Sequence, residues 1–293
     1  MSAVTGGGES DVRAAHHTGT ALAPAGGRRG PMNIVVLIKQ VPDTYSERKL
    51  DGSDGTLDRE ATDAVLDEIN ERAVEAALQL KEANDGSEVT VVAMGPDRAT
   101  DAIRKALSMG ADKAVHLSDE ALHGSCAVQT SKALAKLIET VEGGYDIVLA
   151  GNEASDGRSG AVPAMVADLL GLPALTHARE VTVEGGTVSV TRETDDGVTK
   201  LTAELPALVS VNEKINEPRY PSFKGIMAAK KKPVSTLSLA DAGIDASQVG
   251  LANALSTVTS SQPKPPKSAG EKVEDEGDGG SKIAAYLVSQ KLV

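Results

Sequence analysis

The stretch Asn33-Ile-Val-Val-Leu-Ile-Lys39 decides the fold, because it is a short apolar run rich in β-branched residues. Such a run predicts a strand that is buried on both faces of a sheet. Further runs of this kind lie at residues 88–94, 113–117 and 145–151. The expected helices, which alternate with these strands, span residues 67–83, 99–108, 126–140 and 161–170. Because strands and helices alternate, the sequence predicts an α/β fold built on a parallel sheet.

The pattern changes after residue 172, where apolar and polar residues alternate. Residues 180–190 and 192–205 are expected to form an antiparallel hairpin or meander, with turns at Gly185-Gly186 and at residues 195–197. Residues 207–211 predict one more buried strand. The expected architecture is therefore a parallel sheet with an antiparallel β addition.

Both ends of the chain are expected to lie outside this unit. Residues 1–31 lack periodicity and an apolar core, which predicts a disordered extension rather than a signal peptide. Translation from Met32 is a hypothesis that N-terminal mass spectrometry of the native protein would test. Residues 262–280 predict an extended tether, because they are rich in Pro, Gly and charge. Residues 281–293 predict a short amphipathic helix that packs on a partner or, alternatively, folds back on its own surface.

The composition limits the function. The chain has 293 residues and a net charge of −12, which argues against general nucleic-acid binding. No apolar run approaches the roughly 20 residues of a membrane span. The single cysteine, Cys126, excludes an internal disulfide, fits a cytoplasmic protein and is expected in a helical core. His116, His123 and His177 have no evident Ser or Cys partner, and the carboxylates are expected to be mostly solvated, so no catalytic site is predicted.

Ligands of open parallel sheets bind at the carboxyl ends of the strands. Two candidate loops lie there, at residues 36–42 and 151–160, and the second precedes an expected helix. Its small residues allow backbone amides to approach an anion, while Arg158 and Ser159 offer a positive charge and a hydroxyl. This loop predicts a phosphate site, with an ordinary capped turn as the alternative. Neither G-x-G-x-x-G after the first strand nor G-x-x-x-x-G-K-[ST] is present.

Residues 216–232, NEPRYPSFKGIMAAKKK, hold the only Phe of the chain and five basic residues. The two prolines exclude a helix between them, so the next helix is expected to begin near Gly225 and Phe223 is expected in a loop. A lone Phe is usually part of a core. A large apolar side chain beside four lysines is instead typical of an interaction hot spot.

Several of these stretches together resemble a known family over about residues 32–245. The most specific are Asn216-Glu-Pro-Arg-Tyr220 and Ile226-Met-Ala-Ala-Lys-Lys-Lys232, supported by residues 33–43, 70–78, 94–96 and 106–112. On these residues the chain resembles the β subunit of electron-transfer flavoprotein (ETF). The resemblance implies a Rossmann-like, adenine nucleotide α-hydrolase-like fold. It also implies a heterodimer with an α subunit that holds most of the FAD, while this subunit binds AMP.

The resemblance further implies which residues form the sites. AMP is expected against Leu37, Ile38, Lys39, Asn70 and Met94, with its phosphate on Asp156, Gly157, Arg158, Ser159 and Gly160. Tyr45 is expected to face the FAD across the subunit interface. The implied recognition loop, which docks partner dehydrogenases, comprises Tyr220, Pro221, Ser222, Phe223, Lys224 and Gly225. The sequence departs from the usual family pattern at Gly157-Arg158-Ser159, Thr199 and Ser210.

The implied function is electron transfer without a catalytic site on this chain. Acyl-CoA and other flavin dehydrogenases would supply electrons to the FAD, and ETF-quinone oxidoreductase would receive them. Within the family, a second FAD in place of AMP would indicate electron bifurcation. A universal-stress-type ATP sensor and an ATP-pyrophosphatase-type enzyme are alternatives of similar fold. The expected domains are residues 1–31, an AMP-binding unit of residues 32–235, and an arm of residues 236–293 that packs on the α subunit.

Overall fold

The computed structural model describes residues 30–266, 270 and 272–293, and its described part is built on a nine-stranded sheet. The strands are β1 (Asn33–Ile38), β4 (Glu88–Met94), β5 (Lys113–Leu117), β6 (Ile147–Gly151), β7 (Ala174–Glu184), β8 (Thr187–Thr194), β9 (Gly197–Glu204), β10 (Ala207–Val211) and β11 (Val234–Leu237). Their order is β11-β5-β4-β1-β6-β10-β7-β8-β9. All neighbours from β11 to β7 are parallel, and β7, β8 and β9 form an antiparallel meander. The predicted parallel sheet with an antiparallel addition is confirmed.

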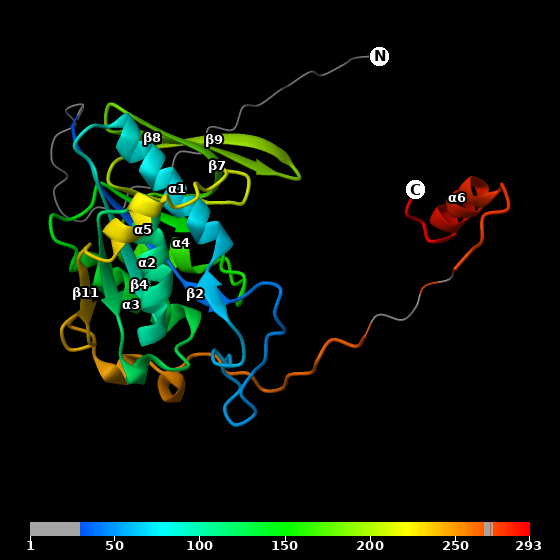
Figure 1. Ribbon diagram of the computed structural model, residues 1–293, viewed down its shortest axis with the longest axis horizontal. Helices are drawn as coiled ribbons and strands as arrows, with labels where there is room; N and C mark the ends of the chain where they lie inside the picture. Colours follow the sequence, from blue (N-terminus) through cyan, green and yellow to red (C-terminus); the bar gives the residue numbers. More distant parts are fainter. Residues whose placement is uncertain (1–29, 267–269, 271) are drawn as a thin grey trace, which may run out of the picture.

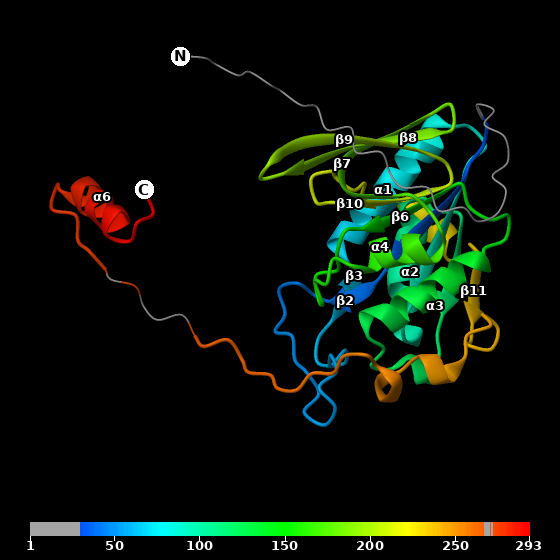
Figure 2. The ribbon, with the colours of Figure 1, turned by 180° about the vertical axis from the view of Figure 1, so that it is seen from behind.

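Helices cover both faces of this sheet. These are α1 (Glu68–Ala83), α2 (Thr100–Met109), α3 (Ala127–Glu139) and α4 (Val162–Leu169). Two further helices are α5 (Phe223–Ala229), which packs on α2, and α6 (Gly279–Ser289), none of whose residues is buried. Four short 3-10 helices lie at Asp97–Ala99, Glu120–Leu122, Ala246–Gln248 and Leu251–Asn253. The buried side chains of α1 and α2 form one apolar cluster with the sheet, and those of α3 and α4 form a second on the opposite face. Figure 1 shows the first pair of helices and Figure 2 the second.

The strand β1 lies at the centre of the sheet because its side chains are apolar on both faces. Ile34, Val36 and Ile38 join the cluster beneath α1 and α2. Val35 and Leu37 point the other way and join the cluster beneath α3 and α4. Burying such a strand on both faces removes its entire apolar surface from water, which is worth about 25 cal/mol per Å². This explains why the run lacks the polar alternation of a half-exposed strand.

Local signals set the ends of the helices. Asp67 caps α1 by accepting hydrogen bonds from the backbone N–H groups of Ile69 and Asn70. Gly110 ends α2 with φ of 146°, and a Cβ there would approach Leu78 to 3.1 Å. The predicted helices that correspond to α1, α2, α3 and α4 are confirmed to within about a residue at their ends.

The sequence did not predict β11, which pairs parallel with β5 at the edge of the main sheet, nor a second small sheet. The strands β2 (Gln40–Pro42) and β3 (Ala64–Leu66) pair antiparallel and form a separate two-stranded sheet. They enclose an irregular loop, residues 43–63. The sequence predicts a polar, Gly- and Asp-rich loop from Val41 to about Asp58, without the two paired strands at its ends. Asp43 N donates to Asp63 O over 2.9 Å and closes the loop.

After β11 the chain remains on the α/β unit, because Leu239, Ala242 and Val249 are buried in the apolar cluster of α3 and α4. It leaves the unit only beyond the 3-10 helix Leu251–Asn253 (Figure 1). The predicted amphipathic helix is present as α6, and none of its residues is buried. Most residues between 254 and 278 that the structure describes carry no helix or strand, as the tether prediction requires. Residues 1–31 were predicted to be disordered. Residues 1–29 of this segment lie outside the described residues.

Candidate functional site

The strand order reverses direction between β1 and β6, and in this fold class the carboxyl ends of the strands at such a point are where a ligand crevice is expected. We call this region the crevice. From β1 the chain proceeds outward through β4 and β5, whereas β6 lies on the other side of β1 and leads to β10. Side chains cannot fill such a switch point as densely as they fill the sheet faces, so ligands of this fold class bind there. The residues at its rim come from the end of β1, the start of α1 and the loop of residues 151–160 that follows β6.

Hydrogen bonds join these three segments. Lys39 N donates to Asn70 Oδ1 over 2.7 Å, which ties the end of β1 to the first turn of α1. Lys39 Nζ lies 2.8 Å from Asp156 Oδ1, which ties β1 to the loop after β6. The close approach also depends on Gly151, where a Cβ would lie 2.5 Å from Asn70 Nδ2. Lys39, Asn70 and Asp156, which the family resemblance assigns to one AMP site, thus lie together.

Asp67 organises the crevice, although it was not among the predicted site residues. Its side chain is fully buried, and in addition to capping α1 it accepts a 2.8 Å hydrogen bond from Ser155 N. Asp67 N in turn donates to Lys39 O over 3.0 Å. The Asp67 carboxylate therefore connects the N-terminus of α1 to the loop of residues 151–160. The Asp before a helix could have been recognised as a cap, but its second partner is 88 residues away.

Two polar atoms in this loop lack a partner. Asn152 Oδ1 and Ser155 Oγ are buried and make no hydrogen bond within the described part of the chain. Buried polar atoms make hydrogen bonds in the great majority of cases. Two such atoms without a partner in the same loop therefore indicate a place where a ligand can bind. Amide and hydroxyl groups beside the N-terminus of α1 suit the hydroxyls and phosphate of a nucleotide.

The other predicted ligand residues lie at different depths. Leu37 and Ile38 are buried in β1, and Met94 is half-buried at the end of β4, next to β1. Gly157, Arg158 and Ser159 form the exposed outer part of the loop, and Gly160 is half-buried. Arg158 Nε lies 3.9 Å from Glu153 Oε1. Tyr45 is almost fully exposed on the loop of residues 43–63.

The predicted recognition loop lies at the other end of the helices. Residues 216–219, which precede it, are anchored on α1: Arg72 donates to Asn216 O, and Asn216 Nδ2 donates to Arg72 O over 3.0 Å. Arg219 Nε lies 2.7 Å from Glu75 Oε2, and Arg219 Nη1 lies 2.5 Å from Glu82 Oε1. These hydrogen bonds, that to Glu75 first, raise the pKa of Arg219, while Arg219 lowers the pKa of Glu82. The segment is therefore rigidly attached just before Tyr220.

The expected start of the next helix was wrong by about two residues. The helix α5 begins at Phe223 rather than near Gly225, because Ser222 caps it by accepting a 3.0 Å hydrogen bond from Gly225 N. Pro221 is compatible with this start because it precedes the cap. Phe223 is 81% exposed in the first turn, so it is not a core residue. Tyr220, Ile226 and Met227 are exposed beside it in the sequence, and we call these four side chains the apolar patch.

The lysines around this patch do not all have the same role. Lys232, which the sequence grouped with the exposed cations, donates from Nζ to Leu107 O over 3.0 Å and to Ala111 O over 2.5 Å at the C-terminal end of α2. Burial lowers the pKa of Lys232. Lys224, Lys230 and Lys231 are exposed. The basic ring therefore consists of three lysines, and the fourth is a structural contact.

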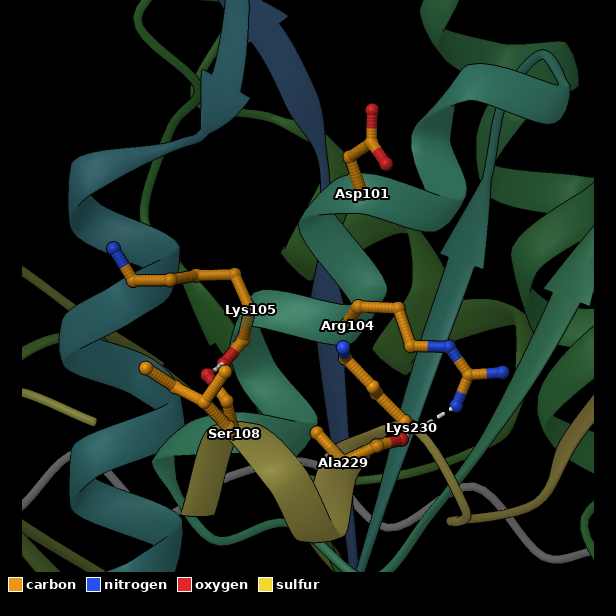
Figure 3. A pocket seen from close by; sticks show the side chains of 7 residues that line it. Asp101, Arg104, Lys105, Ser108, Ala229 and Lys230 are labelled. Carbon is orange, nitrogen blue, oxygen red and sulfur yellow. Dashed lines mark hydrogen bonds between the residues drawn. The ribbon is translucent and has the colours of Figure 1, made fainter. Parts of the chain in front are cut away.

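The helix α5 packs on α2 and leaves a pocket of about 460 Å³ between them (Figure 3). Arg104 closes one side by donating from Nη1 to Ala229 O over 2.7 Å and to Lys232 O over 2.9 Å. Lys105 lies 3.2 Å from Glu71 on α1. The pocket is lined by Asp101, Arg104, Lys105, Ser108, Ile226, Ala229 and Lys230.

The closest contact between α5 and α2 gives a testable prediction. A Cβ at Gly225 would lie 2.5 Å from Ser108 O, so Gly225→Ala must push α5 away from α2. We expect a loss of about 1–3 kcal/mol in the free energy of unfolding, typical of overpacking. Denaturant unfolding measures it, with Gly52→Ala as control, because a Cβ at Gly52 meets nothing within 4 Å. Equal stability of the two variants would contradict this packing.

The remaining candidates do not form a site. Cys126 is not in the core as predicted: it is half-buried at the N-cap of α3. Burial alone would raise the pKa of its thiol, but backbone N–H groups, that of Gln129 first, hold it below the usual value. His116 is buried and donates from Nε2 to Gly95 O over 3.0 Å, and burial lowers its pKa. Among the described residues, no three His, Cys, Asp or Glu side chains are grouped as metal ligands.

No helix within the described ranges is long and apolar enough to cross a bilayer.

Comparison with known proteins gives consistent matches. Residues 54–242 match the family described as electron transfer flavoprotein domain. The chain is 66% identical over 265 residues to the electron transfer flavoprotein subunit beta of Mycobacterium tuberculosis, covering 89% of this chain and 99% of the relative. It is 36% identical over 271 residues to the same subunit of Megasphaera elsdenii, covering 89% and 100%. It is also 37% identical over 259 residues to the caffeyl-CoA reductase-Etf complex subunit CarD of Acetobacterium woodii, covering 88% and 97%.

Proposed function

Because this chain belongs to the electron transfer flavoprotein family as a β subunit, we propose that it binds AMP in the crevice and docks partner dehydrogenases through the apolar patch. An α subunit would hold most of the FAD, and this chain would carry no catalytic site of its own. The single observation that supports the nucleotide most directly is the pair of unpartnered buried atoms, Asn152 Oδ1 and Ser155 Oγ, at the switch point of the sheet.

The crevice residues suit AMP in kind. Lys39 places an ammonium group beside the loop of residues 151–160, and Asn152 and Ser155 add an amide and a hydroxyl. A bound nucleotide would satisfy the two unpartnered atoms and place its phosphate near the positive charge. The nucleotide would act as a structural ligand, because no pair of groups for acid–base or nucleophilic chemistry adjoins it in the described residues.

The docking role rests on exposure and charge. Phe223 and Tyr220 are exposed large side chains in a chain whose aromatic residues make up only 2%. They lie beside Lys224, Lys230 and Lys231, although the chain has a net charge of −12. An apolar centre with a charged rim suits a partner that offers an apolar socket with acidic edges. Arg219 and Lys232 hold the segment on α1 and α2, so docking requires little ordering of this chain.

The C-terminal arm would join the heterodimer. The side chains of Ile283 and Tyr286, three residues apart on α6, are exposed, and nothing in the described part of the chain covers them. A tether of roughly 25 residues precedes the helix and gives it reach. We propose that the arm, expected as residues 236–293, packs on the α subunit through its part beyond Leu239, Ala242 and Val249, which are buried in this chain, and that Tyr45 faces the FAD across the same interface.

Electrons would enter the FAD from acyl-CoA and other flavin dehydrogenases, as in fatty-acid oxidation, and leave to ETF-quinone oxidoreductase in the membrane. This chain would take part in the transfer by positioning the FAD domain against each partner while remaining outside the membrane itself. The proposed compartment is the cytoplasm.

The nucleotide content of the heterodimer tests this function. We expect that co-expression with the α subunit, purification and denaturation release one FAD and one AMP per heterodimer, measured by chromatography and absorbance. In Ser155→Ala, which removes one unpartnered hydroxyl, we expect less AMP and unchanged FAD. Release of ATP without flavin and without an associated α subunit would contradict the proposal and favour a stand-alone sensor.

A second candidate keeps the heterodimer but changes the ligand. A second FAD in place of AMP would make the complex a bifurcating one, and the similarity to a subunit of a caffeyl-CoA reductase-Etf complex is the observation that favours it. Two FAD and no AMP per heterodimer would support this candidate.

A further inference from the structure

The loop of residues 43–63 reaches the crevice through one side chain, Arg59. Its Nη2 atom lies 3.8 Å from Asp156 Oδ2, and its Nη1 atom donates to Gln40 O over 3.3 Å. The backbone of Arg59 is fixed as well, because Arg98 Nη1 donates to Arg59 O over 2.7 Å. Arg59 was not among the residues expected to contact a ligand. It nevertheless faces the same carboxylate as Lys39.

This arrangement leaves an excess of positive charge. Lys39 and Arg59 both face Asp156, whose side chain is almost completely buried, so two cations share one carboxylate. Both cations remain about one-third exposed and can therefore reach a group that enters the crevice. The other buried carboxylate of the crevice, Asp67, is occupied by the backbone N–H groups of Ile69, Asn70 and Ser155. A phosphate group between Lys39 and Arg59 would therefore meet positive charge that Asp156 offsets only in part, and a guanidinium group can bind a phosphate through two parallel hydrogen bonds.

The same arginine connects the crevice to Tyr45. The loop begins and ends at the paired strands β2 and β3, and most of its side chains are half-buried or exposed. Its far end is held by Asp54 Oδ2, which lies 2.9 Å from His123 Nε2. Near the crevice, the ion pair of Arg59 with Asp156 attaches the loop of residues 43–63 to the loop after β6. A stronger attachment at Arg59 would reduce the conformational freedom of the loop that carries Tyr45.

We propose that Arg59 binds the phosphate of the adenine nucleotide together with Lys39, and that nucleotide binding thereby fixes the loop of residues 43–63. Arg59 is a positioning residue: it couples occupancy of the crevice to the conformation of the loop that displays Tyr45. This inference rests on the proposed AMP site and adds a residue and a consequence to it.

The test uses the nucleotide-stripped heterodimer and AMP as the probe. Isothermal titration calorimetry measures AMP affinity, and hydrogen exchange of peptides covering residues 43–63 measures loop protection with and without AMP. We expect AMP to protect the loop in the wild type. We expect Arg59→Met to weaken AMP binding by about tenfold and to abolish the protection, since a charged hydrogen bond is lost. Arg59→Lys should restore part of the affinity because it keeps the charge.

Arg48→Met is the matched control, because Arg48 is an exposed arginine of the same loop. It should leave both affinity and protection unchanged, and FAD content should stay constant in all variants. Equal AMP affinity in wild type and Arg59→Met would overturn the inference while leaving the AMP site intact. Weakened binding with undiminished protection would overturn the coupling. A wild-type heterodimer that binds no AMP at all would overturn both this inference and the proposed nucleotide site.

Discussion

Replacing Phe223 by Ala is expected to reduce kcat/KM for electron uptake from a partner dehydrogenase by about 30-fold. The side chain is 81% exposed, so its removal costs little folding free energy. Its apolar area would be buried only against the partner, and truncating a hot-spot residue costs about 2 kcal/mol or more. Steady-state reduction of the ETF flavin by an acyl-CoA dehydrogenase measures the effect, together with the thermal unfolding of the variant.

Val198→Ala is the control for this variant. Val198 is another exposed apolar residue, but it lies on the edge strand β9 rather than in α5. Its truncation should leave both electron uptake and unfolding unchanged. If Phe223→Ala transfers electrons at the wild-type rate, the docking role of the apolar patch is wrong. If it instead lowers the unfolding temperature by several degrees, Phe223 is a packing residue in the complex.

The fold could be predicted because it depends on local patterns. The central strand β1 is apolar at every position from Ile34 to Ile38, so both of its faces are apolar. Only a strand in a sheet with helices on both sides buries both faces. The loop between β6 and α4 was located from its small residues and the position after a strand. Even the start of α5 is locally encoded in Ser222, although the two prolines before it drew the expected start too far toward the C-terminus.

The networks that complete the sites could not be predicted, because their partners are distant in the sequence. Asp67 and Ser155 are 88 residues apart, and Glu75 and Arg219 are 144 residues apart. A glutamate in a helix with many charges is expected to be solvated, as the sequence suggested for the carboxylates in general. Glu75 is buried because Arg219 returns from another part of the chain to cover it. Such pairings follow from the tertiary fold and leave no periodic signal.

Replacing Arg219 by Met is expected to lower the free energy of unfolding by about 2–3 kcal/mol. The Glu75 side chain is only 6% exposed, so losing its partner leaves a carboxylate shielded from water. Breaking a buried pair typically costs about 3–5 kcal/mol, and the partial exposure of Arg219 places the expected value below that range. Chemical denaturation of the heterodimer measures the change.

A matched arginine separates the effect of burial from the loss of any ion pair. Arg179 faces Glu193, and Arg179 and Arg219 are equally exposed at 34%. Glu193, however, is 36% exposed, so water can replace the lost arginine. Arg179→Met should therefore cost less than about 1 kcal/mol. An equal loss in both variants would contradict the argument from burial.

The double variant Arg219→Met with Glu75→Gln addresses the cause directly. If the main cost of Arg219→Met is an unpaired buried charge, neutralising Glu75 should restore part of the stability. Docking should not be restored with it, because the hydrogen bonds that hold Arg219 just before Tyr220 and the apolar patch remain absent. Recovery of stability without recovery of electron uptake would therefore assign two separate effects to one arginine: it neutralises a carboxylate inside the fold, and it holds the docking segment on α1.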